Sequence, residues 1–398
     1  LTLDTNAQFL CARLTELGLR VRGVLTAGDD EIAIAQTLQA AAVRAAVVIC
    51  TGGLGPTGDD LTAQAVVRAF GGALAEDPVA MAQVEARFAR MSRPMNEANR
   101  KQAMLPTGST LLENRNGTAP GFSVATPQGG RAYFLPGVPR EMRPMVDDLV
   151  LPDVLQRFMP TAPQRALFRV MGRGESELQG ALGDVPVRFP GVELGFQAKM
   201  PENHVKLTAP PGVEGFADAA AHVRAILGDD AFSEDPNEEL AGLIGRRLME
   251  RGERLALAES CTGGWVAHLV VTEAGSSRWF ERGWVTYSNE AKTEELGVPA
   301  ELIGRCGAVS EEVARSMAEG ARTTARVDWG VGVTGVAGPG GGTESKPVGT
   351  VCVAVAGPDG THARTLRFGR DRTSNRRFSA WLALELLRRQ LLRRESQA

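Results

Sequence analysis

Apolar residues recur along the chain with two periods, and each period predicts one kind of element. In residues 5–18 and 31–45 they recur every three or four positions, which indicates helices with one apolar face. Residues 19–28 and 46–53 are predicted strands, and the second begins as an unbroken apolar run that reads as buried. This alternation of strands and helices is typical of a parallel sheet covered by helices on both faces.

The middle of the chain has a different pattern, which begins after a proline-rich break at 157–164. The predicted elements there are strands at 166–172, 192–199 and 203–210 and helices at 175–182 and 216–227. Later in the chain, strands, glycine turns and helices alternate again. We therefore predict two α/β three-layer domains with mostly parallel sheets, joined by a small α+β domain. The predicted domains are 1–160, 165–235 and 238–398.

Composition limits the partners and the location. The chain has 398 residues, of which 43% are hydrophobic and 23% charged, with a formal net charge of −3. These values are ordinary for a globular protein without a basic face, so we predict no nucleic-acid binding. Five scattered cysteines without a CxxC pair fit a reducing, cytoplasmic setting, and four histidines without ligand spacing argue against a histidine zinc site. We expect neither a membrane span nor a signal peptide.

A glycine-rich segment, TGGLGPTGDDLT, occupies residues 51–62 directly after a buried strand. Its candidate site residues are Gly52, Gly53, Gly55, Asp59 and Asp60. Glycines allow the backbone to approach a ligand closely, and they leave amides free for an anion. Neighbouring carboxylates suit an oxygen-liganded metal or proton handling. We expect Asp60 or Thr62 to cap the helix that follows.

A second loop, LPGVPRE at 135–141, also follows a strand and contributes Pro136, Gly137 and Glu141 as candidate residues. Each of the two loops alone is equally well explained as a plain turn. Sheets of this kind bind ligands at the carboxyl ends of their strands. The two loops together therefore favour a site for a phosphorylated ligand.

In the last domain, AESCTGG (258–264) looks like a nucleophile presented on a tight turn. Its three candidates are Ser260, Cys261 and Thr262, between an acidic residue and the glycines that begin at Gly263. The segment by itself does not decide among the three.

A further group of reactive types follows at 273–292, where Ser277, Tyr287 and Lys292 are the candidates. No histidine lies near in sequence, so a serine–lysine arrangement is the available one. Burial favours the neutral form of a lysine, which then accepts a serine proton, and a tyrosine hydroxyl can relay that proton. Each residue alone is also explained as a surface lysine, a turn serine or a core tyrosine.

Two further segments of this domain could hold a ligand. VGVTGVAGPGGG (331–342) is a predicted strand entering a glycine loop, with Thr334 at the bend, and it matches neither a P-loop nor a dinucleotide fingerprint. Arg372 and Arg376 are four residues apart and so share one face of a predicted helix, where a guanidinium could bind a phosphate. A solvated or ion-paired role explains these arginines equally well.

Three N-terminal segments, TGGLGPTGDDLT, NRNGTAPGF (114–122) and FLPGVPREM (134–142), resemble the CinA family (competence/damage-inducible protein A), whose first domain is similar to molybdopterin-binding proteins. The resemblance implies metal-dependent hydrolysis of ADP-ribose, with a divalent ion near Asp60. Asp59 stands where molybdopterin-binding proteins have Arg, so molybdopterin chemistry is not implied. Family members start with a strand before the 5–18 helix, and without that strand we expect an incomplete first site.

The segments AESCTGG, GSS, YSNEAK, VTGVAGPGGG and GxRxxxR resemble the C-terminal domain of the same family, a nicotinamide-nucleotide amidase. The resemblance implies hydrolysis of the carboxamide of nicotinamide mononucleotide (NMN) to nicotinic acid mononucleotide and ammonia, without a cofactor. It implies Ser277 as nucleophile, with Tyr287 and Lys292 as its proton-handling partners. The implied substrate-binding residues are Ser260, Thr262, Gly263, Thr334, Gly338, Arg372 and Arg376.

The middle domain resembles the KH-like linker domain of this family, and without a basic face we predict no RNA binding. The expected partners are small nucleotides, NMN and ADP-ribose, and a second copy of the chain in a homodimer. Two other interpretations stay open. The chain could act mainly as a nucleotide pyrophosphatase through Asp60, or it could be a non-catalytic nucleotide-sensing partner in competence.

Overall fold

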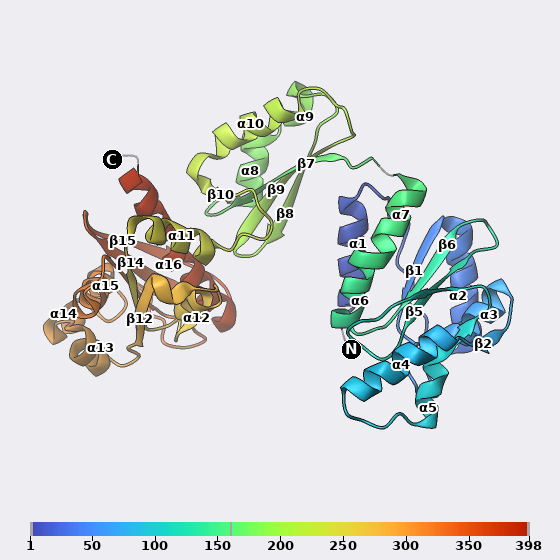
Figure 1. The fold of residues 1–398 in the computed structure, drawn as a ribbon. Coiled ribbons are helices and arrows are strands. Elements are labelled where there is room, and N and C mark those ends of the chain that lie inside the picture. Colours follow the sequence, from blue (N-terminus) through green and yellow to red (C-terminus); the bar gives the residue numbers. More distant parts are fainter. Residues whose placement is uncertain (1–2, 160, 396–398) are drawn as a thin grey trace. The chain divides into compact units, whose positions relative to one another are not determined.

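A computed structural model describes residues 3–159 and 161–395 (Figure 1). The chain divides into two compact units, Leu1–Pro163 and Gln164–Ala398. The first unit contains a four-stranded sheet, a separate two-stranded sheet and their helices, and the second contains two separate sheets. Among the described residues no helix combines the length and the apolar character needed to cross a bilayer.

The first unit is built on a four-stranded sheet in the order β1-β6-β5-β4. β1 (Val47–Thr51) and β6 (Arg131–Leu135) are parallel, and β5 (Gly121–Ala125) and β4 (Thr110–Leu112) continue the sheet antiparallel. The other elements of the unit are α1 (Thr5–Glu16), α2 (Glu31–Arg44), α3 (Thr62–Phe70), β2 (Leu74–Glu76), α4 (Pro78–Arg90), α5 (Glu97–Arg100), β3 (Met104–Pro106), α6 (Pro139–Met145), a π-helical turn (Val146–Val150) and α7 (Leu151–Phe158).

Helices cover both faces of this sheet. Successive side chains of a strand point to opposite faces, so neighbouring residues of β6 pack in two different cores. Phe134 of β6 packs in a core with α2, α3 and α4 and stacks on Phe122 with ring centroids 4.8 Å apart. Its neighbour Tyr133 packs in a second core with α1, α6 and α7. The first unit is therefore a three-layer domain, and Figure 1 shows α1 and α2 on opposite sides of the strands.

The predicted strand at 19–28 is wrong, since this segment has no regular secondary structure. A strand forms only where a neighbour accepts and donates its backbone hydrogen bonds. β1 is the edge of the sheet and, among the described strands, pairs with β6 alone, so residues 19–28 leave its outer side unpaired. They run beside β1 instead of pairing with it.

The second unit begins with the small α+β domain, whose antiparallel sheet has the order β10-β7-β9-β8. Its elements are β7 (Gln164–Val170), α8 (Glu175–Leu182), α9 (Val185–Arg188), β8 (Glu193–Lys199), β9 (Glu202–Ala209), α10 (Phe216–Leu227) and β10 (Ala231–Ser233). α8 and α10 pack on the sheet around a core that includes Phe168 and Val205. The helices predicted around 175–182 and at 216–227 are confirmed.

The last domain has a five-stranded sheet in the order β12-β11-β13-β14-β15. β12, β11 and β13 are parallel to one another, whereas β14 and β15 are antiparallel. Its strands are β11 (Leu255–Glu259), β12 (Phe280–Val285), β13 (Trp329–Gly335), β14 (Thr350–Gly357) and β15 (Gly360–Arg367). Its helices are α11 (Leu240–Arg251), α12 (Trp265–Val271), α13 (Asn289–Leu296), α14 (Ala300–Cys306), α15 (Glu311–Ala325) and α16 (Arg372–Glu395).

The predicted α/β class is confirmed in both large domains. α11, α12 and α16 pack in the core on one face of the five-stranded sheet, and α13, α14 and α15 cover the other face. Both large sheets also carry antiparallel strands, which the alternation of strands and helices did not predict.

The small α+β domain contacts the far end of α16. Arg388 donates to the Asp229 carbonyl at 2.5 Å, and Arg389 forms an ion pair with Asp230 at 2.8 Å. Met171 and Phe232 join the core of the last domain. The helix that begins with Arg372 is thus fixed at its other end by the small domain.

Candidate functional site

Three parallel strands of the last domain end at one edge of their sheet, and the loops that follow them form the candidate site. β11 ends at Glu259, beside Val285 at the end of β12 and Val333 in β13. Loops at the carboxyl ends of parallel strands are the usual place for a ligand in such a sheet. AESCTGG, YSNEAK and VTGVAGPGGG therefore lie at this edge.

Lys292 of α13 is the most unusual residue of the edge, because its side chain is buried with 1% exposed. Its Nζ lies 3.1 Å from Ser260 Oγ. It also donates to the carbonyls of Thr286 at 2.8 Å, Ser288 at 3.3 Å and Tyr287 at 3.4 Å. Burial lowers the pKa of Lys292, since an apolar surrounding penalises the charged form. A neutral Lys292 has a lone pair that can accept the Ser260 proton.

The AESCTGG turn is held together by Glu259, a role that the sequence reasoning missed. The buried Glu259 carboxylate accepts hydrogen bonds from the amides of Gly264 at 3.0 Å, Val266 at 3.1 Å and Ala267 at 2.8 Å. Gly263 and Gly264 take the left-handed conformation that the turn requires, with φ of 60° and 90°. The amides at the start of α12 therefore serve the protein's own carboxylate. An acid directly before a glycine turn and a helix is a signal that could have revealed this role.

Cys261 can be removed from the list of possible nucleophiles. Its side chain is buried, and burial raises the pKa of the thiol to about 12. The reactive form of a cysteine is the thiolate, which is scarce at neutral pH with such a pKa.

The two arginines at the start of α16 contact two different loops of the site. Arg372 donates to the Gly338 carbonyl at 2.6 Å and to the Tyr287 hydroxyl oxygen at 3.2 Å. The Tyr287 side chain itself is 62% exposed. The structure thus brings three of the predicted residues together in one place.

Arg376, one turn further along α16, sits over the AESCTGG turn. It donates to the Thr262 carbonyl at 2.8 Å, and its guanidinium lies 5.4 Å from the centroid of the Trp265 ring. A Cβ on Gly263 would come within 3.1 Å of the same guanidinium. The predicted residues Thr262, Gly263 and Arg376 therefore form a second group beside the first.

Thr334 is buried in β13, where its hydroxyl donates to the Ala308 carbonyl at 2.9 Å. It is close to the turn, because the amide of Ser260 donates to the carbonyl of Val333 at 2.9 Å. The hydroxyl oxygen keeps its capacity to accept a hydrogen bond from a ligand.

Three buried polar atoms near this edge have no hydrogen-bond partner among the described residues: Thr262 Oγ1, Thr286 Oγ1 and Asn375 Oδ1. A buried polar atom without a partner costs on the order of 1–3 kcal/mol, so such atoms are rare in folded proteins. Their presence in the AESCTGG turn, beside Lys292 and on α16 fits a place that binds a polar ligand.

Ser277 lies at the opposite end of β12, before the strand begins. It belongs to a short 3-10 helix (Ser276–Arg278) directly before β12, whereas Tyr287 and Lys292 follow β12. β12 has six residues, so about 17 Å of strand separates its two ends at about 3.3 Å per residue. The predicted contact of Ser277 with Tyr287 and Lys292 is therefore wrong within one chain. The side chain of Ser277 is exposed.

In the first unit, the structure brings the predicted glycine loops together. The amide of Gly52 donates to the Leu135 carbonyl at 2.9 Å, just before Pro136, and a Cβ on Gly137 would lie 3.3 Å from the Gly52 Cα. Glu141 accepts a hydrogen bond from Asn114 at 2.9 Å, which adds the NRNGTAPGF loop to the group.

The carboxylate of Asp60 is engaged within its own loop. Asp60 accepts hydrogen bonds from the Thr57 amide at 2.9 Å and the Thr57 hydroxyl at 2.6 Å, and it lies against Gly55. The neighbouring Thr57 lowers the pKa of the exposed Asp59. Within residues 3–159 and 161–395, no three His, Cys, Asp or Glu side chains gather as a metal would require. The divalent ion expected near Asp60 stays a prediction, because a site that substrate phosphates complete needs fewer protein ligands.

The prediction that Asp60 or Thr62 caps α3 is also wrong. Asp60 is occupied by Thr57, and Thr62 is the first residue of the helix. The Thr62 hydroxyl donates to the Gly52 carbonyl at 2.9 Å and so closes the glycine turn instead. The N-cap position is Leu61, which makes no side-chain cap.

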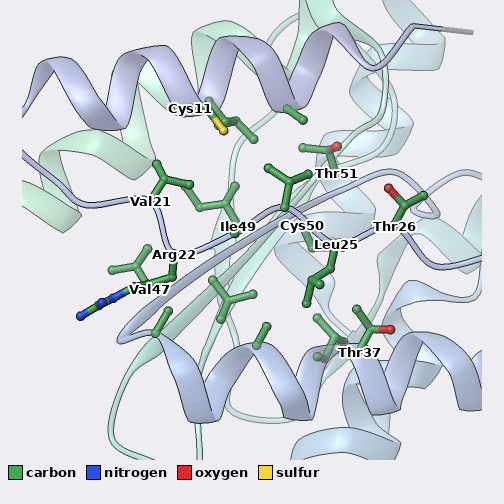
Figure 2. Close-up of a pocket in the computed structure, with 18 of the residues that line it drawn as sticks. Cys11, Val21, Arg22, Leu25, Thr26, Thr37, Val47, Ile49, Cys50 and Thr51 are labelled. Carbon is green, nitrogen blue, oxygen red and sulfur yellow. The ribbon is translucent and has the colours of Figure 1, made fainter.

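A pocket of about 590 Å³ lies in the first unit, between α1, α2, β1 and the irregular segment 19–28. Figure 2 shows Val21 and Leu25 of that segment beside Ile49 and Cys50 of β1. The pocket reaches Gly52 and Gly53 at one end, but none of the predicted carboxylates Asp59, Asp60 and Glu141 lines it. Its wall combines apolar side chains with three arginines, Arg20, Arg22 and Arg44.

Two family models match this chain. Residues 237–391 match the CinA C-terminal domain, and residues 1–156 match a probable molybdopterin binding domain. A CinA-like protein of Anaeromyxobacter dehalogenans (strain 2CP-C) is 44% identical over 391 residues, which cover 97% of this chain and 95% of that protein. A putative competence-damage inducible protein of Symbiobacterium thermophilum is 42% identical over 406 residues, which cover 98% of this chain and 95% of that protein.

Among solved structures, the competence/damage inducible protein CihA from Agrobacterium tumefaciens is 40% identical, with a TM-score of 0.36, over 38% of this chain and 94% of that chain. The two full-length relatives decide the assignment, because each is matched over almost its whole length. This chain belongs to the family of CinA-like proteins.

Proposed function

We propose that the last domain is an amidohydrolase that converts the carboxamide of NMN to a carboxylate and releases ammonia. The observation that carries the proposal is Lys292, a buried lysine with a lowered pKa whose Nζ lies 3.1 Å from a serine hydroxyl. A buried amine beside a serine is an arrangement that activates a weak nucleophile for acyl transfer. The resemblance of this domain to nicotinamide-nucleotide amidases names the substrate.

Arg372 and Arg376 are the groups that bind the phosphate of NMN. Each guanidinium has five N–H donors, of which the structure uses one or two in contacts with Gly338, Tyr287 and Thr262. The remaining donors suit a phosphate, which arginine binds with paired hydrogen bonds. The amides that begin α12 are occupied by Glu259, so the arginines carry this task.

In the reaction, the Ser260 oxygen attacks the carboxamide carbon while its proton passes to the neutral amine of Lys292, 3.1 Å away. The carbon–nitrogen bond then breaks, and the leaving amine takes a proton from Tyr287, which Arg372 holds by its hydroxyl. Ammonia departs and leaves a serine ester. Water then attacks the ester and gives one proton to the Tyr287 phenolate, while the departing serine oxygen takes back the proton held by Lys292. One amide and one water thus give one acid and one ammonia, and all three side chains return to their starting state.

The direct test is ammonia release from NMN by the purified full chain. Wild type should turn NMN over, and Lys292→Met should lose the activity because Met cannot accept a proton. Lys199→Met, at an exposed lysine of β8, is the matched control and should behave as wild type. NMN binding without ammonia release by wild type would instead identify a nucleotide-sensing protein and refute the proposal.

A further inference from the structure

We infer that Trp265 is a positioning residue that makes the site selective for a phosphorylated nucleotide, because its ring holds the Arg376 guanidinium in place without neutralising its charge. This inference rests on the proposed function of the site, in which Arg376 binds the phosphate of NMN. In this role Trp265 acts through Arg376 and makes no contact with the substrate. It should therefore decide how strongly the enzyme prefers NMN over the same molecule without a phosphate.

The first observation is the arrangement around the Arg376 guanidinium. It lies 5.4 Å from the centroid of the Trp265 ring, within the roughly 6 Å over which an aromatic face attracts a cation. The same guanidinium donates to the Thr262 carbonyl at 2.8 Å. It also lies against Gly263, where a Cβ would come within 3.1 Å of it. Three neighbours from one turn therefore fix the position of this guanidinium.

The second observation is that the Trp265 ring has a rigid base. Trp265 is the first residue of α12, and the amides of its two chain neighbours, Gly264 and Val266, donate to the buried Glu259 carboxylate at 3.0 Å and 3.1 Å. The half-buried Trp265 side chain packs against the core of the last domain. The ring is thus held by the backbone on one side and by the core on the other, so it can in turn hold the guanidinium.

The third observation is that Arg376 is held by uncharged groups. Three other arginines of α16, Arg388, Arg389 and Arg394, form ion pairs with carboxylates at 2.7 Å, 2.8 Å and 2.6 Å. Within residues 3–159 and 161–395, no carboxylate pairs with Arg376. A carboxylate in direct contact would offset the positive charge that attracts a phosphate. An aromatic face and a carbonyl hold the guanidinium and leave its charge available.

A guanidinium that is already in place binds a phosphate better than a mobile one. A free arginine side chain samples many rotamers, and ordering it when a ligand binds costs free energy that lowers the affinity. The contact with Trp265 orders Arg376 before the substrate arrives. Without the ring, Arg376 would keep its charge and lose this advantage. The contribution of Trp265 should therefore appear only in the binding of phosphorylated compounds.

The test compares NMN with nicotinamide riboside, which is NMN without its phosphate, as substrates of the full chain. Trp265→Leu removes the aromatic face and keeps an apolar side chain. KM for NMN should rise about 3- to 10-fold with kcat nearly unchanged, as for loss of a partly exposed cation–π contact. KM for nicotinamide riboside should stay as in wild type. Trp265→Phe keeps an aromatic face and should restore most of the affinity for NMN.

A double-mutant cycle separates a positioning role from a direct contact with the substrate. In the Arg376→Ala background, Trp265→Leu should have no further effect on KM for NMN, because the group that the ring holds is already absent. Phe378→Leu is the matched control. Phe378 lies on the same helix beneath a different arginine, Arg370, at 4.6 Å, and its replacement should leave KM for both substrates unchanged.

Two results would overturn the inference: an equal rise in KM for nicotinamide riboside, or an undiminished effect of Trp265→Leu in the Arg376→Ala background. Either result would mean that Trp265 contacts the substrate itself or only supports the fold of the site. The proposed function fails separately, if wild type binds NMN and releases no ammonia. Equilibrium binding of NMN and nicotinamide riboside to the same variants then takes the place of KM, and the same two results decide.

Discussion

The two glycine turns of this chain, TGGLGPTGDD and AESCTGG, follow the same plan and differ in what lies behind them. Each follows a strand, contains an acidic residue and leads into a helix. In the first, Asp60 binds Thr57 of its own loop. In the second, Glu259 binds the amides of the helix, and the buried Lys292 stands beside the turn. The two turns thus differ in whether a buried titratable side chain lies beside them. The sequence of a glycine turn alone does not show whether such a neighbour is present.

The pKa shifts of the two sites make the same point. Thr57 lowers the pKa of Asp59, which strengthens its charged form and makes it a poorer proton acceptor. Burial lowers the pKa of Lys292, which weakens its charged form and makes it a better proton acceptor at neutral pH. Only the second shift favours a proton acceptor of the kind that the proposed reaction needs.

The variant with the largest expected effect is Lys292→Arg, which tests whether Lys292 acts as a proton acceptor. Arginine keeps the positive charge but cannot become neutral near pH 7, so a proton acceptor at this position would be lost. We expect kcat for NMN to fall about a thousandfold, as for loss of a general base. The measurement is steady-state ammonia release. If Lys292→Arg kept most of the activity, Lys292 would act only through its charge.

Removal of Arg376 should have a smaller effect, and mainly on binding. Arg376→Ala loses a charge-assisted contact with the substrate phosphate, so KM for NMN should rise about 10- to 100-fold with kcat changed much less. Arg377→Ala, the exposed neighbour on the same helix, is the control. A fall in kcat at unchanged KM would place Arg376 in the chemical step.

The glycine turn of the first unit should be sensitive in stability but not in amidase activity. Gly53 has a φ of 69°, and an added Cβ would collide with the Thr62 hydroxyl. Gly53→Ala should therefore destabilise the first unit by about 1–3 kcal/mol, as strained left-handed positions do. Denaturant unfolding of the variant tests this, and unchanged NMN turnover is expected. Reduced turnover would show that the two turns act together.

The smallest effect concerns pH and the free energy of unfolding. Lys292 has a lowered pKa when folded and its ordinary value of 10.5 when unfolded, so the unfolded chain binds more protons between these two values. The contribution of Lys292 to stability should thus rise with pH across that window, by at most about 1.4 kcal/mol per pH unit. Comparison of wild type with Lys292→Met by unfolding at several pH values isolates the effect. Parallel pH curves for the two proteins would contradict a lowered pKa.

Most helices of the fold could be predicted from sequence, since apolar periodicity is a local property. The helices at 175–182 and 216–227 are bounded as expected. The strand at 19–28 could not be judged in this way, because a strand also needs a neighbour to pair with, and that neighbour is not part of the local pattern. The antiparallel pairing of β14 with β15 likewise depends on which strands become neighbours, and apolar periodicity does not indicate that.

For the site, residue types were easier to predict than distances. The sequence indicated Tyr287, Lys292, Arg372 and Arg376, and the structure brings them to one edge of the sheet. Ser277 is only ten residues before Tyr287, yet a strand runs between them and carries them apart. Ser260 is far from Lys292 in sequence and touches it in space.

The carboxylate of Glu259 has a consequence for the flexibility of the proposed binding turn. By accepting hydrogen bonds from three amides, it holds the loop in one shape without a ligand. A ligand that enters does not have to order this loop, so little conformational entropy is lost on binding. The site is preorganised, and substrate recognition should follow lock-and-key behaviour at the turn, with fast association and no loop-closure step.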